Sequence, residues 1–141
     1  PTVLAYMNNS NADVLSLTTT PQTLVNYNSS GNVVLPFDAT LGTITANIDG
    51  IYDFNFVGNF AFTGITSTRA IYIDVYNETD TASVFRFTGS IPRDADELGI
   101  AFTIPASISG TTVTSIHISA SANIDVTLEG VSYGVTSKNV R

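Results

Sequence analysis

Aromatic residues recur with a period of two along residues 50–62, which read GIYDFNFVGNFAF. Side chains alternate between the two faces of a β-strand, so this pattern predicts one strand with an aromatic face and a mostly polar face. The aromatic face comprises Tyr52, Phe54, Phe56, Phe60 and Phe62, and the other comprises Asp53, Asn55, Val57 and Asn59. Five rings, each contributing about 1.5 to 3 kcal/mol when buried, require a second layer to cover them. The segment therefore predicts a two-layer β protein.

Strand-like segments separated by turn signals continue along the chain, and none shows the 3.6-residue period of an amphipathic helix. The expected strands, besides 50–62, are residues 2–7, 14–17, 23–27, 33–35, 43–47, 69–77, 83–88, 98–104, 112–122 and 124–135. Residues 28–32 are expected to form a hairpin loop, and the tail after Thr136 is polar. This arrangement predicts an all-β jelly roll, or a related two-sheet sandwich, in a single domain over residues 1–141.

Charge and composition exclude several classes of function. Twelve acidic and five basic residues give a net charge of -7, which disfavours nucleic acid and anionic lipid as partners. The chain has no cysteine, so thiol catalysis and disulfides are excluded. Charged residues make up only 12% of the chain, which leaves a surface rich in Ser, Thr and Asn that suits an extracellular or virion protein.

No set of residues predicts catalysis, a metal site or a cofactor. His117 is the only histidine, and Ser115 and Ser119 share its strand face without forming a triad, so we interpret it as a polar-face residue. The acidic cluster of Asp94, Asp96 and Glu97 lacks the spacing of a calcium loop and is interpreted as a solvated loop. The sequence therefore predicts a protein that is not an enzyme and needs no cofactor.

A row of polar and aromatic side chains is a candidate ligand site. Residues 69–77 alternate so that Ile71, Ile73 and Val75 face inward, and Tyr72, Asp74 and Tyr76 face outward. Two tyrosines flanking a carboxylate are suited to stacking on a sugar and accepting bonds from its hydroxyl groups. We favour a subunit contact or a partial core for the same row, because tyrosine is favoured at protein interfaces in general.

The segment IDGIYDFNFVGNFAFTG resembles the signature strand of the C1q and tumour-necrosis-factor-like jelly rolls, in which Gly-Ile-Tyr precedes alternating aromatic residues and a closing glycine. The final strand, LEGVSYGV, resembles the closing segment of that family. The matching residues are Gly50, Ile51, Tyr52, Phe54, Gly64 and Gly130. The resemblance implies a homotrimer in which Asp53, Asn55, Val57 and Asn59 face the threefold axis.

The polar, weakly charged surface is more similar to bacteriophage members of this family than to animal ones. The resemblance then implies a knob at the end of the tail needle or tail fibre of a short-tailed bacteriophage, as the C-terminal part of a longer fibrous protein. Its expected partners are itself and a host cell-surface component, either a glycan or an outer-membrane protein. Expected host contacts are the loops at residues 8–13, 28–32 and 93–97.

Two other interpretations remain open at this point. A monomeric carbohydrate-binding module would use Tyr72 and Tyr76 as its stacking platform. A bacterial surface or spore-coat C1q-like domain would follow a collagen-like stalk.

The trimer hypothesis carries an electrostatic consequence. Three Asp53 carboxylates close to one axis would repel each other unless they were paired with a cation, an arginine or a ligand, or protonated.

Overall fold

The computed structural model describes residues 2–32 and 34–140, and this part of the chain contains strands and no helix. Its strands are β1 (Val3–Asn9), β2 (Val14–Leu17), β3 (Gln22–Thr23), β4 (Ser29–Asn32), β5 (Phe37–Asp38), β6 (Thr43–Ala46), β7 (Gly50–Phe62), β8 (Arg69–Asn77), β9 (Ala82–Ile91), β10 (Glu97–Ile108), β11 (Thr112–Ala120) and β12 (Ile124–Val140). The all-β prediction is confirmed. The described residues accordingly include no helix that is long and apolar enough to cross a membrane.

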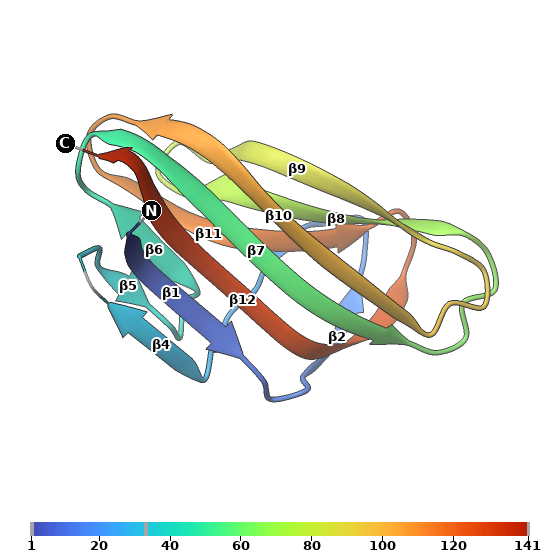
Figure 1. Cartoon of the computed structure of the whole chain (residues 1–141). Coiled ribbons are helices and arrows are strands. Elements are labelled where there is room, and N and C mark those ends of the chain that lie inside the picture. The colour runs from blue at the N-terminus through green and yellow to red at the C-terminus, as the bar shows by residue number, and fades with distance from the viewer. Residues whose placement is uncertain (1, 33, 141) are drawn as a thin grey trace.

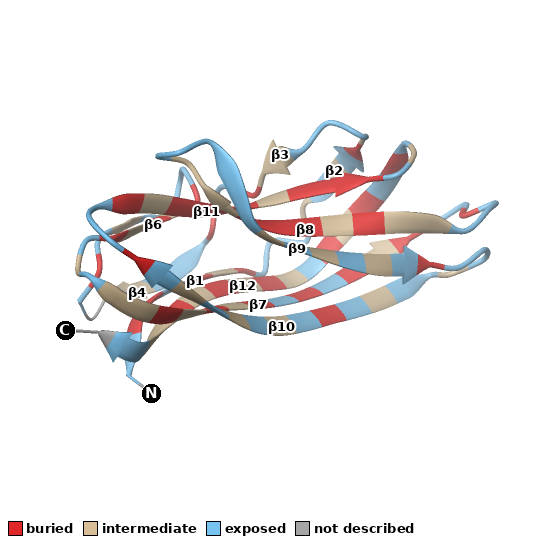
Figure 2. Cartoon of the chain, turned by 90° about the horizontal axis from the view of Figure 1, so that it is seen from above, coloured by how far each residue is buried: buried red, intermediate tan, exposed pale blue. Residues whose placement is uncertain are grey.

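The strands form two antiparallel sheets that pack face to face (Figures 1 and 2). In the first, which we call the β7 sheet, the order is β10-β7-β12-β1-β4, and β2 also pairs with β12. In the second, which we call the β8 sheet, the order is β5-β6-β11-β8-β9, and β3 also pairs with β11. The predicted two-sheet jelly roll is therefore confirmed.

The aromatic strand lies at the centre of the β7 sheet, between β10 and β12. Phe54 pairs with Val135 on one side and Ile104 on the other, so its ring points into the sandwich along with those of its alternate neighbours. The predicted inward rings are all buried: Tyr52, Phe54, Phe56, Phe60 and Phe62. Figure 2 shows buried positions alternating with more exposed ones along strands of both layers. The inward row of β8 is also buried, at Ile71, Ile73 and Val75.

One end of the sandwich holds the two ends of the described chain, and the opposite end holds three loops. The described chain ends lie together at one end, where the Thr2 amide donates to the Ser137 hydroxyl at 3.2 Å. The loops at residues 63–68, 92–96 and 121–123 lie at the opposite end (Figure 1). We call these the terminal end and the free end.

The prediction for residues 23–35 is wrong in detail. Residues 28–32 were expected to be a loop, but residues 29–32 form β4, which pairs with β1 from Asn8 to Ala5. The expected strand at 23–27 is reduced to β3, because Asn26 adopts a positive φ of 58° that ends regular pairing. Of the expected strand at 33–35, residue 33 lies outside the described part, and residues 34 and 35 form a bend.

Candidate subunit interface

The outer face of the β7 sheet carries the side chains that the resemblance assigns to a threefold axis. Asn55 is held by both neighbouring strands: it accepts a hydrogen bond from the Thr103 hydroxyl at 2.7 Å and donates to the Thr136 hydroxyl at 3.3 Å. Val57 is 48% exposed, although it lies in the middle of a central strand. Asn59 is exposed, and Asp53 is partly buried. The four residues therefore form one outward row on β7.

A hollow of about 390 Å³ lies on this face, beside Val57. Gly134 lies between Asn55 and Tyr6 in the strand register, and its lack of a side chain lowers the floor of the hollow. The Tyr6 ring forms one wall and is 41% exposed. The ring lies so close to Gly31 on β4 that a Cβ there would be 2.4 Å from it.

Sequence reasoning missed Tyr6 and Gly134 as parts of this surface. The signal that could have identified them is the pairing of a large exposed ring with glycines on both neighbouring strands, β4 and β12. That signal depends on knowing which strands are neighbours, so the sequence pattern of β1 alone could not reveal it.

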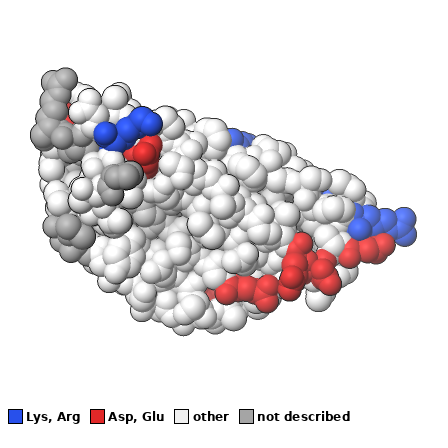
Figure 3. All heavy atoms as spheres, viewed as in Figure 1, with Lys and Arg blue, Asp and Glu red and all other residues white. Residues whose placement is uncertain are grey.

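Charged side chains are almost absent from the middle of this face. Figure 3 shows a broad central area without charged atoms, with acidic residues towards one border and a basic side chain beside an acidic one towards the terminal end. On β10, the outward positions after Glu97 are Gly99, Ala101, Thr103, Pro105 and Ser107. A face with few charged side chains and an apolar hollow is easily covered by another protein surface, because little charge has to be desolvated.

A second apolar surface lies along the edge where β9 and β10 meet. Phe102 is partly buried, and its ring centroid is 5.6 Å from that of Phe87 and 5.4 Å from that of Phe85. It also stacks on the buried Phe56 at 5.5 Å. Further along β10, Ile104 and other apolar residues pack against the core while remaining partly exposed. The sandwich is thus only partly closed on this side.

The structure places the outward row of β8 under neighbouring side chains. Asp74 is 2% exposed, and its carboxylate accepts two hydrogen bonds from the Arg86 guanidinium, at 2.8 and 3.0 Å. The same guanidinium lies over the Tyr72 ring, 4.7 Å from its centroid. The Tyr76 ring stacks on His117 at 3.9 Å. The three predicted ligand-binding residues are therefore largely engaged within the chain.

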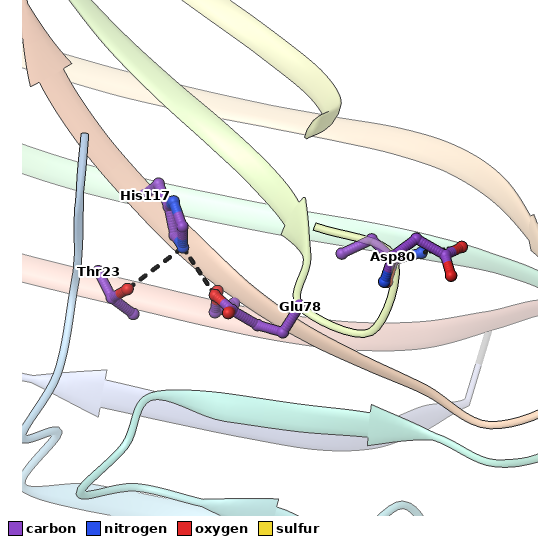
Figure 4. A network of polar contacts seen from close by, with 6 residues as sticks. Thr23, Glu78, Asp80 and His117 are labelled. Atoms are coloured by element: carbon purple, nitrogen blue, oxygen red, sulfur yellow. Dashed lines mark hydrogen bonds and ion pairs between the residues drawn. The ribbon is translucent and has the colours of Figure 1, made fainter. Parts of the chain in front are cut away.

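His117 lies in a polar network on the β8 sheet (Figure 4). Its Nε2 is 2.7 Å from the Glu78 carboxylate and 3.2 Å from the Thr23 hydroxyl. Ser115 donates a second hydrogen bond to the same carboxylate oxygen, at 2.7 Å. Burial raises the pKa of Glu78, but the bonds from Ser115 and His117 outweigh this effect and hold the pKa below its ordinary value. The network anchors the turn after β8 to β11.

The three predicted host-contact loops lie in different places. Residues 93–96 belong to the free end, where the Asp94 amide donates to the Ile65 carbonyl at 2.9 Å. Residues 10–13 connect β1 to β2, and residues 29–32 form the edge strand β4.

Within residues 2–32 and 34–140, no group of three or more His, Asp or Glu side chains is arranged to hold a metal ion.

Comparison with known proteins identifies the fold. No family model and no curated protein matches the sequence. Among solved structures, the globular domain of zebrafish complement 1qA superposes with a TM-score of 0.64, over 99% of each chain, at 12% identity. The chain has the C1q/TNF-like jelly-roll fold.

Two tumour-necrosis-factor-like structures give the same result. Eiger TNF from S. frugiperda superposes with a TM-score of 0.62, over 97% of this chain and 94% of that chain, at 6% identity. Murine APRIL at pH 5.0 gives a TM-score of 0.59, over 93% and 96% of the two chains, at 14% identity. Because so few residues are shared, the similarity to the C1q/TNF-like fold rests on strand order and packing.

Proposed function

We propose that this chain is a non-enzymatic trimeric knob at the end of the tail needle or tail fibre of a short-tailed bacteriophage. In this role it keeps a trimeric stalk in register and contacts the host cell envelope during attachment or genome delivery. The observation that carries the proposal is the outer face of the β7 sheet, which has few charged side chains and an apolar hollow beside Val57. A C1q/TNF-like jelly roll that leaves such a face open is suited to self-association.

Two different surfaces of the chain are suited to contact each other. The hollow at Tyr6, Val57 and Gly134 is on a sheet face, and the partly exposed rings around Phe102 are on the β9/β10 edge. When one surface of a copy packs on a different surface of the next, the contact is heterologous and closes into a ring if the rotation permits. A rotation of 120° closes such a ring with three copies.

The positions of the chain ends are compatible with a stalk. Residues 2 and 137 are paired at the terminal end of the sandwich. A stalk joined there would leave the loops of the free end pointing away from it (Figure 1). Those loops would then be the part of the knob that first meets a host surface.

Size-exclusion chromatography with light scattering tests the trimer directly. We expect a mass of three times the chain mass of 14.9 kDa. Val57→Glu introduces a charge at an exposed position on the interface and should yield monomers that retain the β-sheet circular dichroism spectrum. Leu41→Glu is the matched control, because Leu41 is 60% exposed in the turn between β5 and β6 of the β8 sheet and its replacement should leave the trimer intact. A monomeric parent protein would overturn the proposal.

The sequence upstream of residue 1 tests the needle or fibre assignment. Heptads with apolar a and d positions would support a coiled-coil stalk, as the proposal requires. Gly-X-Y repeats would instead favour the C1q-like surface or spore-coat protein.

A further inference from the structure

A pocket of about 490 Å³ opens near the free end of the sandwich, away from both surfaces of the proposed subunit contact. It lies where the end of β7, the start of β8, the end of β2 and the start of β12 meet. Its volume is within the range of small-molecule sites, about 300 to 1,000 Å³. Its polar lining includes Thr18, Thr63, Arg69 and Asp125.

Arg69 brings a positive charge to this pocket without a carboxylate partner. Its Nη1 donates to the Asn123 carbonyl at 3.0 Å, whereas its Nε is buried and has no acceptor among the described residues. Arg86, by contrast, is fully paired with Asp74. A guanidinium offers five donors in a planar fork, and a buried donor without an acceptor is unfavourable. Arg69 lines the pocket and keeps guanidinium donors that no described residue accepts, and a carboxylate bound in the pocket would take such donors.

The opposite wall of the pocket carries a carboxylate and hydroxyl groups, which can accept hydrogen bonds. Asp125 is exposed and accepts a hydrogen bond from the Ser16 hydroxyl at 2.8 Å. Its carboxylate lies beyond ion-pair distance from Arg69, since no salt bridge joins them within 4.0 Å. The hydroxyls of Thr18 and Thr63 also line the pocket. A ligand that matches both walls needs a carboxylate on one side and hydroxyl donors on the other.

Apolar side chains complete the lining. Leu17, Ile65 and Ile124 are nearly buried, at 1%, 3% and 6% exposure, and they border the pocket beneath its polar rim. Because these side chains are nearly buried, they contribute little accessible surface, and the polar groups of the lining select the ligand.

We propose that this pocket binds an acidic sugar residue, with its carboxylate on Arg69 and its ring hydroxyls on Asp125 and the neighbouring threonines. The proposal rests on the proposed function for its biological setting, because the free end of a phage knob would face an envelope glycan. The binding site itself is independent of the trimer.

Isothermal titration with methyl β-glucuronide, using methyl β-glucoside as the neutral probe and acetate as the plain anion, tests the site. We expect the glucuronide to bind about tenfold more tightly than either of the other two probes, since only it matches both walls. Arg69→Gln should reduce glucuronide affinity about tenfold. Arg93→Gln is the matched control, because Arg93 is an exposed arginine at the same end and should leave the affinity unchanged.

Asp125→Asn provides a second variant if Arg69→Gln does not fold. It alters an exposed side chain, and it should weaken the glucuronide more than acetate. Equal binding of acetate and glucuronide, absence of glucuronide binding, or equal loss in the Arg93→Gln variant would each overturn the proposal. Light scattering on the same samples reports the trimer separately, so failure of the sugar site and failure of the knob assignment are distinguishable.

Discussion

Gly42 lies in the turn between β5 and β6 with a positive φ of 73°, a conformation that side chains with a Cβ rarely adopt. A Cβ added at Gly42 would be 2.1 Å from the Leu24 carbonyl oxygen. Leu24 cannot shift freely, because its amide donates to the Ile116 carbonyl of β11 at 2.8 Å. Gly110 has a similar φ of 76°, but a Cβ there would meet nothing within 4 Å.

We therefore predict that Gly42→Ala destabilises the fold more than Gly110→Ala. Gly110→Ala should cost about 1 to 2 kcal/mol from backbone conformation alone. Gly42→Ala should cost about 1 to 3 kcal/mol more, because the Leu24 segment must move. Urea unfolding of the two variants measures the difference, and equal midpoints would show that the Leu24 contact is readily relieved.

Two buried tyrosines differ in how their hydroxyls are satisfied. The Tyr133 hydroxyl is 2.6 Å from that of Thr114, which itself donates to the Ile44 carbonyl at 2.9 Å. The Tyr27 hydroxyl is buried without a hydrogen-bond partner among the described residues. Burial raises the pKa of both phenols, so both are neutral in the folded protein at ordinary pH.

Tyr133→Phe should therefore destabilise the protein by about 1 kcal/mol, whereas Tyr27→Phe should be neutral or stabilising. Thermal unfolding of the two variants provides the measurement. The change is the same in each case, loss of one buried hydroxyl, so the comparison isolates the hydrogen bond. A larger loss for Tyr27→Phe would mean that its hydroxyl has a partner in solution.

At the scale of single elements, β7 was predictable and β4 was not. The aromatic alternation of β7 is local, so its boundaries, its buried face and its outward row all follow from residues 50–62. The sequence of β4, Ser-Ser-Gly-Asn, has the composition of a turn. It becomes a strand because β1 supplies hydrogen-bond partners along an open sheet edge, and this information lies in residues 5–8.

The turn after β8 shows how a polar network ties one element to another. Glu78 receives hydrogen bonds from Ser115 and His117, and its pKa is lowered relative to the ordinary value of 4.5. A lowered pKa in the folded state means that the carboxylate stabilises the protein above pH 4.5. This contribution is lost as the pH falls through the folded-state value.

We predict that Glu78→Gln reduces stability at neutral pH and flattens the loss of stability between about pH 5 and pH 3. Thermal melting as a function of pH provides the measurement. Glu129→Gln is the matched control, because Glu129 is exposed and has no hydrogen bond or ion pair within the described residues. If the melting temperatures of the parent and of Glu78→Gln change in parallel with pH, the ionisation of Glu78 does not contribute to the pH dependence of stability.

At the scale of the whole molecule, the sequence predicted which row of β7 faces outward but not the surface around it. Asn55 and Val57 line the hollow, yet its wall and floor come from Tyr6 and Gly134, which are more than forty residues away from β7 in the chain. The Arg69 pocket is similarly assembled from three separate strands, β2, β8 and β12, and from the loop after β7. Alternation within a strand identifies faces, and only the pairing of strands determines which residues share a face.

Asp53 gives the proposed trimer a measurable electrostatic signature. Its cross-strand neighbours are Pro105 and Thr136, and among the described residues no Lys, Arg or His side chain forms an ion pair with it within 4.0 Å. Three such carboxylates around one axis repel each other while they are ionised, and protonation in acid removes the repulsion. Asp53→Asn removes the charge and retains the shape of the side chain.

We predict that Asp53→Asn raises the melting temperature of the trimer at neutral pH and leaves it unchanged in acid. The rise should be larger at low ionic strength, where the repulsion is less screened. Differential scanning calorimetry at two salt concentrations across the pH range measures both effects. Glu97→Gln, at the border of the same face, controls for a general change in net charge. If the melting temperatures of the parent and Asp53→Asn stay in parallel at every pH, the three carboxylates do not approach one another, and β7 does not line the axis.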